Sequence, residues 1–324
     1  MSTSYQLDTA TGMSSIILML DSEDATAYYM TNAEGGNVTS YFSKTLQTPI
    51  VPPHGSQTLV SLYSCTIPYS WYNIRPELND TVDLFVTDLD GTSNRSAEYS
   101  FTLPKGNYGA TALRQALVNG THAQTGIAVN VGFDPLTYKL SFSTAHATRM
   151  VHLDFEGTHR HVTPYKEMGF NPVGQKAIKA GSPLSSENVI DVSGSVHGLY
   201  INTNLTDDSV INSKGVASNI ISRVPIDVPN GGLIFHQPSN STHRHLVGNR
   251  VISQVVCQLT DTRGRILDLN GLQWQIQIAF DFVPDKPRVH RPIGSLRSMM
   301  DALVDSAPAK PTRVPRKNKR GKQV

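Results

Sequence analysis

The sequence predicts a mainly β protein whose antiparallel strands pack as a sandwich. Of its 324 residues, 39% are hydrophobic and only 17% are charged. Ser, Thr, Asn, Gln and Gly are therefore the main polar residues, which is typical of β-rich proteins with many turns. Strand-like runs are short and are separated by clusters of Gly, Pro, Asn and Asp. Helical stretches between them are scarce, which argues against a βαβ arrangement.

The clearest strand lies between Gln273 and Phe282, where apolar and polar residues alternate. A period of two over this length indicates a strand with one face in the core. A helix would scatter the same side chains round its circumference. The residues expected to face the core are Trp274, Ile276, Ile278, Phe280 and Phe282.

The preceding run, Arg250–Thr260, also predicts a strand, with apolar residues on both faces. Turn residues follow it at Asp261–Gly264 and again at Asn270–Gly271. A short strand is expected between these turns, at Ile266–Leu269. The three strands are therefore expected to follow one another as a meander.

Other strands are expected where apolar and β-branched residues run between turn signals. Asp134-Pro135 lies between two of them and predicts a hairpin turn. In chain order the further strands are Ile16–Leu20, Thr58–Thr66, Val82–Thr87, Tyr99–Leu103, Ile127–Phe133, Thr137–Ser143, Met150–Phe155, Val189–Val192, Leu199–Asn202 and Ile220–Ile226.

Two short amphipathic helices are expected, at Ala110–Val118 and at Leu296–Val304. Ser295 is a suitable N-cap for the second helix. This helix follows several prolines beyond the last strand, so we expect it to be detached from the main core. It either packs back on its own domain or docks against a neighbouring subunit.

The C-terminal stretch 309–324 is rich in Pro, Lys and Arg, contains no acid and is expected to be disordered. Without its seven cations, 21 basic residues face 26 acidic ones, so the body carries about −5. Three roles are open for the tail: an inert solvated tail, a non-specific contact with phosphate or an acidic partner, and a nuclear-import signal. No aromatic residue is interleaved, so base stacking is not expected. The candidate contact residues are Lys310, Arg313, Arg316, Lys317, Lys319, Arg320 and Lys322.

Signals for secretion, membrane insertion and catalysis are missing from the sequence. The polar N-terminus lacks a secretory pattern, and no apolar run approaches the ~18 residues that span a bilayer. No nucleophile elbow, P-loop, dinucleotide fingerprint or H-E-x-x-H occurs. Asp88 and Asp90 are interpreted as solvated turn acids, and Cys65 and Cys257 as buried free thiols. We expect no enzymatic activity, catalytic residue or cofactor.

Histidines form the one repeated motif, because Thr-His-Arg-His occurs at Thr158–His161 and again at Thr242–His245. In an extended strand the two histidines of each copy would face the same side, a spacing that can hold Zn²⁺ or Ni²⁺. No carboxylate at ligand spacing completes either copy, so no metal site is predicted. Polar loop residues, pH-responsive interface residues and a metal site remain three open interpretations.

Four segments carry a resemblance to a known family. They are Leu46–Ile50 leading through Val60–Leu62 to Ile67–Ile74, then Phe101–Tyr108 before the helix at Ala110, then Ser218–Ile226, and finally Leu259–Phe282. Each motif is short, and their order along one chain is the specific signal. In this order they resemble the penton or minor capsid proteins of virophages, polinton-like viruses and related large double-stranded DNA viruses.

The resemblance implies a jelly-roll subunit that forms homopentamers at the vertices of an icosahedral capsid, beside the major capsid protein. The protein is then expected in the virion, with the viral genome as a possible partner of the basic tail. The family also carries an insertion between jelly-roll strands, for which 98–183 is the candidate, as a small α+β or β subdomain. The expected parts are a flexible arm 1–13, a jelly-roll body 14–285, a Pro-rich linker with a short helix 286–308, and a basic disordered tail 309–324.

Two other functions stay open at this stage. A minor capsid protein would lie between major capsomers and be tied inward by the basic tail. A jelly-roll attachment module would bind glycans through loop aromatics such as Tyr69, Trp71 and Tyr72. For these three residues, packing in the core or at a strand edge is the simpler interpretation.

Overall fold

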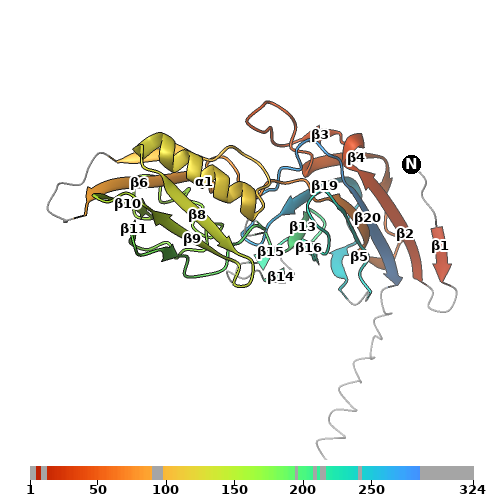
Figure 1. Cartoon of the computed structure of the whole chain (residues 1–324). Helices are drawn as coiled ribbons and strands as arrows, with labels where there is room; N and C mark the ends of the chain where they lie inside the picture. The colour runs from red at the N-terminus through yellow and green to blue at the C-terminus, as the bar shows by residue number, and fades with distance from the viewer. Residues whose placement is uncertain are drawn as a thin grey trace, which may run out of the picture. The chain divides into compact units, whose positions relative to one another are not determined.

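The computed structural model describes residues 5–8, 13–89, 98–193, 196–206, 210–211, 217–239 and 243–284. All of these residues belong to one compact unit. Antiparallel strands dominate it, and one α-helix is present in the described ranges (Figure 1). The predicted fold class, a mainly antiparallel β protein, is confirmed.

One sheet, here called the β20 sheet, has the strand order β1-β2-β20-β5-β17, and β18 pairs with a second stretch of β5. Its strands are β1 (Tyr5–Asp8), β2 (Met13–Asp21), β5 (Ser56–Pro68), β17 (Leu233–His236), β18 (His245–Gly248) and β20 (Gln275–Pro284). A short 3-10 turn, η1 (Ser22–Asp24), follows β2.

A second sheet, the β19 sheet, has the order β16-β13-β19-β4-β3. Its strands are β3 (Ala27–Tyr28), β4 (Tyr41–Ile50), β13 (Leu199–Thr203), β16 (Ile220–Val224) and β19 (Ile252–Thr260). A separate two-stranded hairpin joins β14 (Val210–Ile211) to β15 (Ala217–Ser218).

The two sheets together have the topology of a jelly roll. Two groups of four antiparallel strands face each other, in the orders β2-β20-β5-β17/β18 and β4-β19-β13-β16. The chain crosses between the groups several times, so neighbours within a sheet are distant in sequence. The jelly-roll sandwich implied by the resemblance is therefore confirmed as the fold.

The first hydrophobic core lies in this sandwich, and β20 shows how the sequence builds it. The four predicted core residues of β20, and Trp274 directly before it, are buried, each no more than 4% exposed. Trp274 places its ring against Phe42 of β4, with centroids 5.7 Å apart, and its Nε1–H donates to the carbonyl of Thr39 at 3.1 Å. The alternation therefore sets which face of β20 is buried, and Trp274 links β20 to the opposite sheet.

A second core is built from the elements between β5 and β13 (Figure 1). Its sheets have the orders β11-β10-β6-β7 and β12-β9-β8. The core residues run from Ile74 to Ile190, and the predicted insertion 98–183 falls within that range. The domain boundaries themselves stay a prediction. The elements are β6 (Thr81–Asp88), β7 (Tyr99–Thr102), α1 (Ala110–Thr125), β8 (Val129–Asp134), β9 (Lys139–Thr144), β10 (Arg149–Asp154), β11 (Gln175–Ile178) and β12 (Leu184–Ser185).

The helix α1 starts where predicted but continues for seven residues beyond Val118. Gly120 lies inside the helix, where it serves packing. A Cβ atom at this position would lie 2.3 Å from the ring of Phe101, so only glycine lets the helix approach β7 this closely. The helix ends instead at Gly126, which adopts the left-handed conformation with φ of 66°.

Three strand predictions are wrong. The meander is wrong because β19 and β20 belong to different sheets, so the chain between them crosses the sandwich. The strand expected at Ile266–Leu269 is reduced to one bridge between Thr260 and Ile266, since Leu267 and Leu269 instead fill the core. The strand expected at Val189–Val192 is a loop in which only Ile190 is buried among the apolar residues.

Several predictions fall outside the described residues. These are the helix Leu296–Val304, the linker 286–308 and the basic tail 309–324 with all seven of its candidate contact residues. In the predicted arm 1–13, residues Tyr5–Asp8 form β1 and pair with β2. The hairpin predicted at Asp134-Pro135 is confirmed, because β8 and β9 pair across this turn.

Candidate functional sites

The first Thr-His-Arg-His copy forms turns rather than an extended strand, so its two histidines are not held on one face. His159 is bonded to Asp83 of β6: its Nδ1 lies 2.7 Å from one carboxylate oxygen, and its backbone N–H donates to the other at 2.7 Å. The Asp83 side chain is only 8% exposed. His159 therefore fixes the turn to β6 and provides hydrogen-bond partners for the buried carboxylate of Asp83.

The second copy is described from His243 onward and has a different role. His245 is buried at the start of β18, with Nε2 3.3 Å from the carbonyl oxygen of Ile221. The Nε of Arg244 lies 3.4 Å from a carboxylate oxygen of Asp281 on β20. Among the described residues, no three His, Cys, Asp or Glu side chains gather closely enough to hold a metal ion.

The two cysteines offer no reactive thiol, and only one of the two neighbouring aspartates is described. Cys65 and Cys257 are buried and free, as predicted, and burial raises the pKa of each thiol to about 12. Both thiols are thus protonated at neutral pH and are poor nucleophiles. Asp88 is the last residue of β6, and one of its carboxylate oxygens lies 3.8 Å from Nε of Arg149. Asp90 lies outside the described residues.

Of the three aromatic residues proposed for glycan binding, Trp71 is buried, whereas Tyr69 and Tyr72 are half-buried. Trp71 is 1% exposed and stacks on Tyr69 with ring centroids 4.2 Å apart. Burial is also the main cause that raises the pKa of Tyr69. A sugar-binding platform needs an exposed aromatic face, which the buried Trp71 does not offer. The simpler interpretation, core packing, is the one that the structure supports for Trp71.

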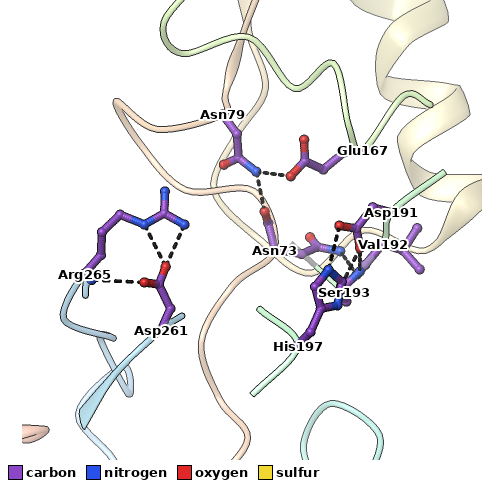
Figure 2. Close-up of polar contacts among 9 residues, drawn as sticks. All are labelled: Asn73, Asn79, Glu167, Asp191, Val192, Ser193, His197, Asp261 and Arg265. Atoms are coloured by element: carbon purple, nitrogen blue, oxygen red, sulfur yellow. Dashed lines mark hydrogen bonds and ion pairs between the residues drawn. The ribbon is translucent and has the colours of Figure 1, made fainter. Parts of the chain in front are cut away.

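A buried polar network lies where the chain leaves the jelly roll for the second core (Figure 2). Asn73 stands at its centre, just after the first core's Trp71. Its side-chain nitrogen donates to the carbonyls of Tyr108 and Val192, both at 2.8 Å, and its side-chain oxygen accepts from the backbone N–H of Tyr108 at 2.8 Å. One side chain thus joins the entry to α1 with the segment that returns to β13.

Asn79 extends the network to a buried acid (Figure 2). Its side-chain nitrogen donates to the carbonyl of Asn73 and to Oε1 of Glu167, both at 2.7 Å. Glu167 is only 4% exposed. Burial raises its pKa to about 7, although the hydrogen bonds it accepts act in the opposite direction. Glu167 therefore changes protonation near neutral pH.

Two arginines, Arg75 and Arg265, face the same region. The guanidinium of Arg265 contacts the fully buried Asp261 through Nε at 2.7 Å and Nη2 at 2.6 Å, and Asp261 also accepts the backbone N–H of Arg263 at 2.8 Å (Figure 2). Burial, followed by the positive charge of Arg265, lowers the pKa of Arg75. This arrangement fixes the turn after β19 beside the junction.

Sequence reasoning missed the junction residues Asn73, Asn79 and Glu167. Asparagine in a loop predicts a turn, and nothing in the local pattern around Glu167 predicts that an acid there is buried. The network depends on segments more than 80 residues apart, and a single sequence gives no signal for such pairings. The two Thr-His-Arg-His motifs, which the sequence suggested as candidate sites, instead anchor separate turns and strands.

Comparisons with known proteins bear on the fold. No protein-family model matches the chain, and none of the curated proteins matches it. Among solved structures, the chain is similar to the mavirus penton protein, whose crystal structure was obtained with selenomethionine labelling. The two share 10% identity with a TM-score of 0.50, over 83% of this chain and 100% of the penton chain. In the described ranges, no helix is long and apolar enough to cross a membrane.

Proposed function

We propose that this chain is a structural virion protein, a penton subunit that forms homopentamers at the icosahedral vertices of a double-stranded DNA virus capsid. The observation that carries the proposal is the likeness of its fold to the mavirus penton protein along the whole of that chain. A shared jelly roll alone hosts many functions. Here the ordered segments from Leu46 to Phe282 point to the same class of protein from the sequence side.

The physical properties of the molecule support a structural role. A capsid subunit needs a rigid body and closed symmetry rather than an active site. The two hydrophobic cores are joined by a side chain, Asn73, whose polar atoms are hydrogen-bonded to several segments. His159 and Asp83 are hydrogen-bonded to each other, and Cys65 and Cys257 are buried. We therefore propose a protein without enzymatic activity.

The proposal includes the partners and the location of the protein. Further copies of the chain would complete the vertex, the major capsid protein would surround it, and the virion would be its final location. The basic tail, with its seven unopposed cations between Lys310 and Lys322, would reach the genome or another acidic partner by releasing counterions.

Native mass spectrometry of the full chain tests the proposal. A homopentamer is expected at about 177 kDa, five times the 35.4 kDa of one chain. A species that stays monomeric at every concentration, and is missing from purified particles, would contradict it. Deleting residues 310–324 should leave the pentamer intact and lower genome retention. A chain that binds between major capsomers without forming pentamers would instead be the minor capsid protein.

A further inference from the structure

The exposed apolar residues of this protein are unevenly distributed over its strands. Among strands whose side chains the structure describes, every exposed large hydrophobic residue belongs to the β20 sheet. Their exposed fractions run from 43% to 61%. They are Met19 of β2, Tyr63 of β5, Leu233 and Phe235 of β17, and Leu246 of β18.

The strand register places Met19, Leu233, Phe235 and Leu246 on the outer face of the sheet, away from the sandwich core, whereas Tyr63 lies at the irregularity in the pairing of β5 with β20. Phe235 pairs with Thr66, and Leu246 pairs with Leu59, while the alternate residues of β5 fill the core. Met19 pairs with Gln277 of β20, whose buried neighbours Ile276 and Ile278 point inward. The outer face of the β20 sheet therefore presents exposed apolar side chains on β2, β17 and β18, with the polar residues Gln275, Gln277 and Asp281 of β20 between them.

The outer face of the β20 sheet has the area of a surface patch that is often functional. Three strand spacings of about 4.8 Å separate β2 from β17 and β18, and Leu59–Pro68 extends for about 30 Å along β5, so the area is on the order of 500 Å². The largest apolar patch on a typical monomer is about 300–600 Å² and is often functional. A standard interface buries about 800 Å² per partner. The outer face alone supplies more than half of that.

The charged residues of the outer face indicate which kind of partner it can bind. None of the six strands in the β20 sheet contains Lys or Arg, the residues that commonly protect an exposed sheet edge from pairing. The central acid, Asp281, is 8% exposed and paired with Arg244. Nucleic acid or an anionic lipid surface would require unopposed cations. A face without net repulsion suits another protein surface, including one on an identical chain.

From these observations we infer that the outer face of the β20 sheet, with the edge strands β17 and β18, is the surface through which one copy of this chain binds the next. The inference rests on the proposed homopentamer and names the face that builds it. In a ring the contact is heterologous, so this face meets a different surface of the neighbouring copy. Within the described residues, β17 and β18 pair only with β5, which leaves their outer edges for the neighbour.

The test replaces exposed apolar residues of the face with lysine in the full-length chain. Phe235→Lys combined with Leu246→Lys should raise the concentration at which the pentamer dissociates at least tenfold, as measured by sedimentation velocity. Leu136→Lys is the matched control, because Leu136 is 91% exposed in the turn between β8 and β9, and it should leave dissociation unchanged. Thermal unfolding of each variant shows whether its fold is intact.

A second measurement does not depend on a disruptive variant. In Phe235→Cys the new thiol is the reactive one, since Cys65 and Cys257 are buried with raised pKa values. Its alkylation should be at least tenfold slower in the pentamer than in dilute, dissociated protein. Equal rates, or a lysine variant that assembles like the parent chain, would overturn the inferred face while leaving the homopentamer in place. A parent chain that never assembles would overturn both.

Discussion

The buried carboxyl of Glu167 makes the stability of this protein depend on pH in a defined direction. Its pKa is raised from 4.5 to about 7, with burial as the largest cause. The folded state therefore binds more protons than the unfolded state between these two pH values. Stability contributed by this group is present below pH 4.5 and is lost as the pH rises through 7. At about 1.4 kcal/mol for each pKa unit, the ionised group costs roughly 3 kcal/mol above pH 7.

The substitution Glu167→Gln removes the ionisation and keeps the shape. The amide oxygen can still accept the hydrogen bond from Asn79 that Oε1 accepts at 2.7 Å. We expect the variant to match the parent chain at pH 4.5 and to exceed its free energy of unfolding by roughly 3 kcal/mol at pH 8.5. Urea unfolding across this range, followed by circular dichroism, measures the difference. Glu77→Gln, at an exposed position, is the control and should show no such trend.

The pH dependence of this difference in the free energy of unfolding tests whether the pKa of Glu167 is raised. A variant that is equally stable relative to the parent chain at pH 4.5 and pH 8.5 would refute the assignment of a raised pKa to Glu167. A variant that loses stability at pH 8.5 would show that the carboxylate is favourably held in the junction. Either result would mean that the contact between Asn79 and Glu167 does not make the free energy of unfolding fall with rising pH.

Three further outcomes follow from the packing. Gly120→Ala should destabilise the fold by about 1–3 kcal/mol, because a clash with the ring of Phe101 outweighs the ~1 kcal/mol that alanine gains in a helix; a more stable variant in urea unfolding would contradict the close approach. Asn73→Ala should cost about 2–4 kcal/mol, since it removes the three hydrogen bonds of a buried side chain, each worth about 1 kcal/mol, and an unchanged unfolding midpoint would argue against the network. Cys65 and Cys257 should react with a thiol reagent only after unfolding, so rapid labelling of the native protein would show that one of them is accessible.

Local pattern was enough to predict the strands that alternate cleanly. The period-two signal between Gln273 and Phe282 correctly assigned the five apolar core residues, because a strand with one face in the core imposes that alternation directly. The hairpin at Asp134-Pro135 was equally predictable, since its turn residues and its pairing are neighbours in sequence. The overall β class follows from the same kind of local information.

Pairing between distant segments was not predictable in this way. The meander expected around Ile266–Leu269 failed because short apolar runs look alike whether they form a strand or fill a core from a loop. The continuation of α1 beyond Val118 was not predicted either, because the residue that makes Gly120 necessary is Phe101, on another element. Asn73 and Glu167 acquire their roles from partners brought together only by the complete fold. The jelly-roll topology was reached through the resemblance and not through composition or periodicity.

The location of this chain in the assembled particle tests the central proposal most directly. Image reconstruction of purified particles, at a resolution that distinguishes a jelly roll with a second core, gives that location. The proposed function predicts five copies of the chain around each icosahedral vertex. Density for the chain between major capsomers, or a vertex built from a different protein, would contradict it.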